Sequence, residues 1–252
     1  MSESKVWLGL DVSTACIGIC ILVDDGSQHG KIAELTHISP KVPKGVKGIE
    51  ELFIKKNEFH DFIKGFSKYK FDRVIIEEPL VSSNNKNTVA TLLRFNGMIS
   101  DCIYNELGIV PDYISSYDAR KYAFPELMGI RKYGKDNKQY DYNKIIKEIK
   151  SSKFVLFGDY PWAIDKKTII QEKVAEFFPK IEWLYDKKGE LKKENFDATD
   201  AYVACFGQLN KERYGEPNFK VSNISETQGT VEFDVSYWGK TEHRESHYII
   251  NK

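Results

Sequence analysis

Hydrophobic and polar positions along the first forty residues follow the pattern of short β-strands. Apolar runs at 6–10, 17–23 and 32–38 are separated by a polar break at 13–14 and by a turn at 24–27. Strands joined by such short connections pair with their sequence neighbours. The N-terminal segment therefore predicts an antiparallel three-strand meander.

The pattern then changes to helical spacing. Residues 46–66 and 89–107 carry apolar side chains three and four positions apart, and 73–76 form a short apolar run between them. Such a run is typical of a strand buried on both faces. Because strands alternate with helices after the meander, we expect an α/β fold with a mixed five-stranded sheet flanked by helices.

The remaining segments complete this fold and add a small second part. The further expected elements are a strand at 113–115 and helices at 118–127, 168–178 and 195–209. Beyond residue 217, three strand-like segments follow, at 219–224, 230–238 and 243–250. We predict a domain at 1–213, with an insertion at 129–165, and a C-terminal β extension at 214–252.

Composition places the chain among globular proteins. Of its 252 residues, 41% are hydrophobic and 29% charged, and the formal net charge is zero. This balance excludes a disordered chain and gives no bulk electrostatic support for nucleic-acid binding. No apolar run approaches the roughly 18 residues that cross a membrane, and the first residues lack a signal-peptide pattern. We expect a cytoplasmic protein of a bacterial or virus-infected cell.

Cysteine and histidine do not predict a metal site. Each of the four cysteines lies in an apolar segment without a C-x-x-C pair, which indicates buried free thiols. His243 and His247 share a face of a predicted strand, but no further ligand accompanies them.

Acidic residues are the stronger candidates for chemistry. Asp11 directly follows an apolar strand, Glu77 ends the run at 74–76, and Asp197 and Asp200 share one helix face. Carboxylates that converge without a cation raise one another's pKa values, and a hard cation such as Mg²⁺ relieves this. Two such ions about 4 Å apart catalyse phosphodiester hydrolysis.

Each acid also has a structural interpretation. Asp11 is compatible with a turn, Glu77 with an exposed strand end, and the Asp197–Asp200 pair with the positive end of a helix dipole. The functional interpretation depends on the combination of all four.

That combination resembles the RuvC-type Holliday junction resolvases. The segment 8–14 (LGLDVST) followed by Gly18 resembles their first strand and hairpin, and 75–79 (IIEEP) their second acidic motif. The helix at 197–201 (DATDA) resembles their closing helix, and 92–99 (LLRFNGMI) the glycine-containing helix after the Glu strand.

The resemblance covers roughly residues 5–128 and 163–210. It implies an RNase H-like fold, a homodimer, two Mg²⁺ per site with Mn²⁺ as a substitute, and paired symmetric nicks in four-way DNA junctions. In the family's pattern Asp11 would bridge the ions, and Glu77, Asp197 and Asp200 would complete the ligand shell.

Further residues take their roles from the same resemblance. The stretch 115–121, followed later by 165–167, is similar to the segment leading into a lysine-bearing helix start, so Lys166 or Lys167 would contact the scissile phosphate. Glu77 is preferred over Glu78 because adjacent strand residues face opposite sides.

Some features depart from the family. Leu80 stands where the family often has an aromatic wedge, and the insertion has no counterpart. From 131 to 153 the insertion carries eight Lys or Arg against three acids, with tyrosines between them, which favours a DNA-contacting arm but equally fits a solvated surface excursion. The candidate DNA contacts are Leu80, Arg94, Arg120, Lys121, Arg131, Lys132, Tyr133 and Lys135.

Three alternative functions remain open. An RNase H-like nuclease acting on other branched or RNA-containing duplexes would use the same acids. An actin-like ATPase or sugar kinase would share the GLDVST segment, but the glycine-rich loops such a fold needs are not seen in the sequence. A catalytically inactive DNA-binding protein would not need all four acids.

Overall fold

The computed structural model describes residues 4–66, 68–79, 85–125, 166–225, 230–238 and 243–251. The chain forms two compact units, Met1–Ala119 with Ile170–Phe206, and Arg120–Ile169 with Gly207–Lys252. The domain boundary expected after residue 213 stays a prediction. Within the described segments, no helix has both the length and the apolar content that crossing a membrane requires.

The first unit is built on a mixed five-stranded sheet. Its strands are β1 (Lys5–Val12), β2 (Ile17–Asp24), β3 (Lys31–Ile38), β4 (Arg73–Glu77) and β5 (Asp112–Ile114). The order is β3-β2-β1-β4-β5, with β1, β2 and β3 antiparallel and β1, β4 and β5 parallel. This is the strand order of an RNase H-like sheet, and the predicted fold class is confirmed.

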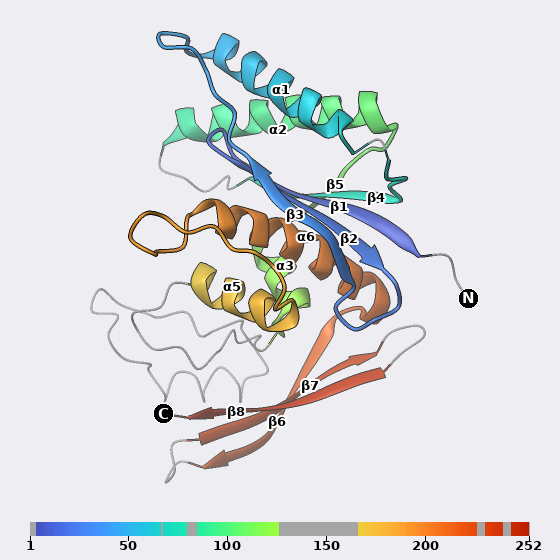
Figure 1. Ribbon diagram of the computed structural model, residues 1–252. Helices are drawn as coiled ribbons and strands as arrows, with labels where there is room; N and C mark the ends of the chain where they lie inside the picture. Colours follow the sequence, from blue (N-terminus) through green and yellow to red (C-terminus); the bar gives the residue numbers. More distant parts are fainter. Residues whose placement is uncertain are drawn as a thin grey trace. The chain divides into compact units, whose positions relative to one another are not determined.

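Helices α1 (Ile49–Lys64) and α2 (Lys86–Leu107) cover one face of this sheet (Figure 1). Alternate strand residues such as Leu10 and Ile76 form a buried core with helix residues that include Phe59 and Phe95. The helix expected at 46–66 begins only at Ile49. Gly48 has a φ of 68°, which is not a helical backbone conformation, so the helix cannot extend through it.

Helix α2 has well-defined ends. The Asn85 side chain accepts hydrogen bonds from the backbone N–H groups of Asn87 and Thr88, as an N-cap residue does. Gly108 follows the helix in the left-handed conformation, with a φ of 70°. The helix therefore includes the whole 92–99 motif.

The opposite face of the sheet is covered by α6 (Glu194–Tyr214) (Figure 1). A Cβ atom built on Gly9 would lie 2.2 Å from the Ala201 carbonyl oxygen, and one on Gly18 would lie 1.9 Å from the Asp197 carbonyl oxygen. The helix backbone thus rests directly on the strand backbone at two glycines. Nearby on this side of the sheet is α5 (Lys166–Phe177) (Figure 1).

Reciprocal hydrogen bonds fix the start of the β1–β4 pairing. The Val6 N–H donates to the Asp72 carboxylate at 2.8 Å, and the Asp72 N–H donates to the Val6 carbonyl at 2.8 Å. From there the parallel register runs from Trp7 opposite Arg73 to Leu10 opposite Ile76.

The second unit contains the predicted C-terminal sheet. Strands β6 (Pro217–Ser225), β7 (Thr230–Trp238) and β8 (His243–Asn251) form an antiparallel sheet in sequence order. The Nδ1 atom of His247 lies 2.7 Å from a carboxylate oxygen of Asp234, its cross-strand partner. This contact gives the imidazole a carboxylate partner on the neighbouring strand.

The helix expected at 118–127 is α3 (Ser116–Ala123), which begins and ends earlier. Its start has a simple cause, because the Ser115 hydroxyl accepts a hydrogen bond from the Asp118 N–H at 3.0 Å, as an N-cap residue does.

Gly18→Ala is expected to lower the free energy of unfolding by roughly 1–3 kcal/mol, because the new methyl group forces α6 away from the sheet. Gly97→Ala is the matched control, since a Cβ there meets nothing within 4 Å. It should raise stability by up to about 1 kcal/mol through helix propensity. Urea denaturation measures both, and a Gly18→Ala protein as stable as the parent would contradict the close contact.

Candidate functional site

Asp11 and Glu77 end two adjacent parallel strands. Leu10 pairs with Ile76, so the next residue on each strand places Asp11 beside Glu77, with the strands about 4.8 Å apart. Leu10 and Ile76 point into the α1–α2 core. Because side chains alternate along a strand, both carboxylates point toward the opposite face, which α6 covers.

Helix α6 brings two more acids to this corner of the sheet. Gly18 is the cross-strand partner of Asp11, and the backbone of Asp197 lies directly over Gly18. Asp200 follows one turn later on the same helix face and is only 2% exposed. The structure thus brings together the backbones of all four predicted acids at one end of β1.

Side-chain hydrogen bonds fix the start of α6. The Asn195 side chain accepts from the Leu184 N–H at 2.9 Å and donates to the Leu184 carbonyl at 2.7 Å. The Thr199 hydroxyl donates to the Asn195 carbonyl at 2.8 Å. These hydrogen bonds attach the first turns of the helix to the preceding segment, and they hold the backbone of Asp197 and Asp200 in place.

The β1–β2 connection next to Asp11 is also held by a serine. The Ser13 N–H and hydroxyl both donate to the Cys16 carbonyl, at 3.1 and 2.8 Å, and the Ser13 hydroxyl accepts from the Cys16 N–H at 3.1 Å. On the other side, the amide of the buried Asn96 in α2 donates to the Val12 carbonyl at 3.4 Å. The backbone that directly follows Asp11 is therefore constrained.

Cys16 places a thiol against one of the acids. Burial raises the pKa of the Cys16 thiol to about 12, and the nearby carboxylate of Asp197, to which the thiol is hydrogen-bonded, adds to the rise. The thiol is protonated at neutral pH and donates to this carboxylate.

Sequence reasoning assigned no role at the site to Cys16 or Asn96. The sequence predicts that Cys16 is buried, but it does not show that Asp197 is its neighbour. An asparagine in the middle of an apolar helix pattern is the signal that points to Asn96, since a buried amide requires hydrogen-bond partners.

The carboxylate side chains of the four acids do not form a metal-binding group in the described structure. Among the described residues, no three His, Cys, Asp or Glu side chains lie together in a group that would hold a metal ion. The residues fit Mg²⁺ in donor chemistry, because all four offer hard oxygen ligands, and in backbone placement. The structure therefore supports convergence of the elements but not a preformed coordination geometry.

The two candidate lysines lie in the other unit. Lys166 and Lys167 begin α5 and belong to Arg120–Ile169, whereas the four acids belong to the first unit. Their contact with a scissile phosphate stays a prediction.

The candidate DNA contacts are distributed over several elements. Arg94 is exposed on α2, and Arg120 and Lys121 are half-buried on α3. Lys121 and the Tyr122 hydroxyl both donate to the Glu216 carboxylate, and these hydrogen bonds lower the pKa of Glu216. The remaining candidates lie outside the described residues: Leu80, Arg131, Lys132, Tyr133 and Lys135.

No family model matches the chain, and no curated protein matches it either. Among solved structures it is similar to Thermus thermophilus RuvC in complex with a Holliday junction substrate, at 6% identity over 82% of this chain and 94% of that chain, with a TM-score of 0.48. A second T. thermophilus RuvC structure shows 11% identity, coverage of 82% and 95%, and a TM-score of 0.47. The yeast mitochondrial Holliday junction resolvase Ydc2 shows 12% identity, coverage of 82% and 78%, and a TM-score of 0.44.

Ppx/GppA family members and a putative sugar kinase from Cytophaga hutchinsonii match with lower TM-scores, from 0.30 to 0.36. All of these TM-scores lie below 0.5, so the strand order and strand directions, and not these matches, identify the RNase H-like sheet.

Millimolar Mg²⁺ or Mn²⁺ is expected to raise the melting temperature by a few degrees, because a bound cation relieves the repulsion among the carboxylates. Asp11→Asn should abolish most of this shift. Asp25→Asn, in the exposed β2–β3 turn, is the matched control and should retain it. Differential scanning fluorimetry measures the shift, and a parent protein unaffected by either metal would count against the site.

Proposed function

We propose that the chain is a metal-dependent, structure-selective DNA endonuclease of the RNase H-like type. The observation that carries the proposal is the meeting of Asp11 and Glu77 at the ends of adjacent parallel strands, under the helix that bears Asp197 and Asp200. Acids from β1, β4 and α6 converge at one end of β1. Their negative charges repel one another, which favours a cation shared between them. A phosphodiester with bound Mg²⁺ is a substrate that such a corner suits.

The four carboxylates would hold two Mg²⁺ ions, for which Mn²⁺ substitutes. Bound there, the ions supply an activated water and charge stabilisation for the leaving oxygen of the phosphodiester. In the backbone, Asp11 lies between Glu77 on β4 and Asp197 over β2, which supports the proposal that its carboxylate would contribute to the binding of both ions.

The four carboxylate side chains would have to change their orientation to bind the ions. Rotation of the carboxylates about their χ angles would close the ligand set, while the backbone stays fixed by the Ser13–Cys16 bonds and by Asn195. The site would thus assemble from a rigid backbone with adjustable side chains.

As substrate we propose a four-way DNA junction, cut by paired nicks. The support is the order of the three acidic motifs and the glycine-containing α2, all of which resemble the junction resolvases. The DNA contacts would come from the candidate residues named above, and Lys166 or Lys167 would contact the scissile phosphate.

Glu77→Gln is expected to reduce cleavage of a four-way junction by at least about a hundredfold, because it removes a charged ligand of the metal ions. Glu78→Gln is the matched control. Glu78 is exposed and directly follows Glu77, so its side chain faces away from the site. Its substitution should leave the rate of junction cleavage within about twofold of the parent rate. Equal losses in the two variants would refute the assignment of Glu77, provided that both melt like the parent.

The substrate class is tested by comparing one mobile four-way junction, one flapped duplex and one RNA/DNA hybrid under single-turnover conditions with Mg²⁺. We expect the junction to be cut fastest, with symmetric nicks in opposite strands. Faster cleavage of the flap or the hybrid would move the assignment to another RNase H-like nuclease. ATP turnover without any cleavage would instead support the actin-like alternative.

A further inference from the structure

The connection between α5 and α6 contains a short β-hairpin, residues 184–193 (Figure 1). Tyr185 and Leu191 form an antiparallel bridge, and the Lys192 N–H donates to the Leu184 carbonyl at 2.9 Å. All of these residues belong to the first compact unit. The hairpin is therefore part of the unit that carries the four acids.

The tip of the hairpin is closed by hydrogen bonds of its own. The Asp186 N–H donates to the Glu190 carbonyl at 2.8 Å, and the Gly189 N–H donates to the Asp186 carbonyl at 3.2 Å. The Asp186 carboxylate accepts from the N–H groups of Lys188 and Glu190, at 2.8 and 2.9 Å. Asp186 and Gly189, which has a φ of 82°, suit such a turn. Its two central positions accept most residue types, so the turn does not explain why Lys187 and Lys188 occupy them.

The hairpin presents an excess of positive charge to solvent. It carries four lysines against two acids, and all four lysines are exposed: Lys187, Lys188, Lys192 and Lys193. Within the described segments none of the four forms an ion pair. One of the two acids, Asp186, already has its carboxylate directed to N–H groups of the turn. The lysines are therefore available to bind an anionic partner.

The hairpin also exposes an aromatic ring. Tyr185 is 55% exposed and Leu184 is 40% exposed. Because consecutive residues of a strand face opposite sides, both faces of the hairpin are open to solvent. Lysines pair with the phosphates of a nucleic acid, and an exposed tyrosine ring is a surface on which an unpaired base stacks. The hairpin combines these two features.

The base of the hairpin is attached to the helix that bears two of the acids. The Asn195 side chain, in the first turn of α6, makes two hydrogen bonds with the Leu184 backbone, at 2.9 and 2.7 Å. Two residues of helix, a rise of about 3 Å, separate Asn195 from Asp197. A DNA strand with one phosphate at the acids thus has neighbouring nucleotides within reach of the hairpin.

We propose that the hairpin binds unpaired nucleotides of the DNA substrate next to the candidate site, with its lysines on the phosphates and Tyr185 stacked on a base. The proposal rests on the proposed nuclease function for the identity of the substrate. It gives the site a preference for DNA with unpaired bases, because the faces of a paired base are covered by its neighbours in the duplex.

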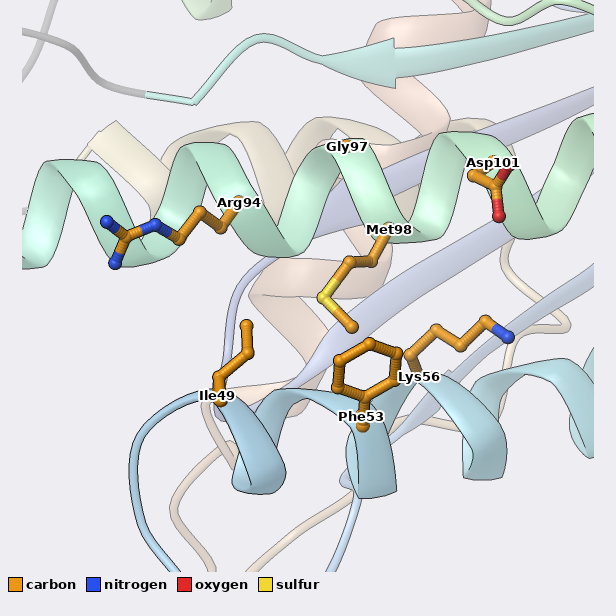
Figure 2. A pocket seen from close by; sticks show the side chains of 7 residues that line it. All are labelled: Ile49, Phe53, Lys56, Arg94, Gly97, Met98 and Asp101. Carbon is orange, nitrogen blue, oxygen red and sulfur yellow. The ribbon is translucent and has the colours of Figure 1, made fainter.

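The groove between α1 and α2 is less suited to a nucleic-acid strand (Figure 2). It has a volume of about 430 Å³ and is lined by apolar and charged side chains that include Phe53, Met98, Lys56, Arg94 and Asp101. Lys56 and Arg94 would attract phosphates, but Asp101 would repel them. The two helices also cover the face of the sheet opposite α6, so a strand bound there would not pass the acids (Figure 1).

The stacking contact is tested by fluorescence anisotropy with a labelled oligothymidine and a labelled blunt duplex, in EDTA so that no DNA is cut. Tyr185→Ala should weaken binding of the oligothymidine roughly tenfold and binding of the duplex by less than about twofold. Tyr185→Phe keeps the ring and should bind both DNAs like the parent. Tyr104→Ala, which removes a tyrosine that is 54% exposed on α2, is the matched control and should also bind like the parent.

The phosphate contacts are tested with the double variant Lys187→Gln, Lys188→Gln. Loss of two contacts should lower the slope of log Kd against log salt concentration by about 1.4 for the oligothymidine. Lys68→Gln, Lys70→Gln, with both lysines exposed shortly before β4, is the matched control and should keep the parent slope.

Three outcomes would overturn the proposal: hairpin variants that bind like the parent, an equal loss for both DNAs in Tyr185→Ala, and a parent that does not bind oligothymidine. A parent that binds as expected but cuts no DNA when Mg²⁺ is added would contradict the nuclease proposal alone.

Discussion

The direct contact of helix α6 with the strand backbones is the constraint on which the candidate site depends. A helix that packs on a sheet through large side chains is held further from it, and its carboxylates then lie further from those of the strands. At Gly9 and Gly18 there is no side chain to hold α6 away, and the helix carbonyls of Ala201 and Asp197 lie against the strands. Small residues on both surfaces thus set the distance between the two sets of acids.

The backbone around the candidate acids is held by the side chains of neighbouring polar residues. Backbone positions near the acids are fixed by hydrogen bonds from Ser13, Asn96 and Asn195. The carboxylates themselves are not locked into a ligand set in the described structure. Mg²⁺ requires near-octahedral geometry but usually keeps several water ligands, so it needs only one or two well-placed carboxylates.

The sequence predicted the elements well because their periodicities are strong. The apolar runs before Asp11 and Glu77 identify two buried strands, and the i, i+3 spacing of Asp197 and Asp200 identifies one helix face. The contact of Cys16 with Asp197 was not predictable, because it depends on which turn of α6 lies over the hairpin. Nor was the α1–α2 groove, because apolar positions such as Phe53 have the same spacing whether they face the core or solvent.

The reciprocal Val6–Asp72 hydrogen bonds have a consequence for the candidate site at the other end of the strands. They align the two central strands at their entry ends, five residues before Asp11 and Glu77, or roughly 16 Å away along the strands. A slip of one residue there would turn Glu77 to the far side of the sheet while every acid kept its place in the chain. The arrangement of the candidate site thus depends partly on an ordinary aspartate at the opposite margin of the sheet.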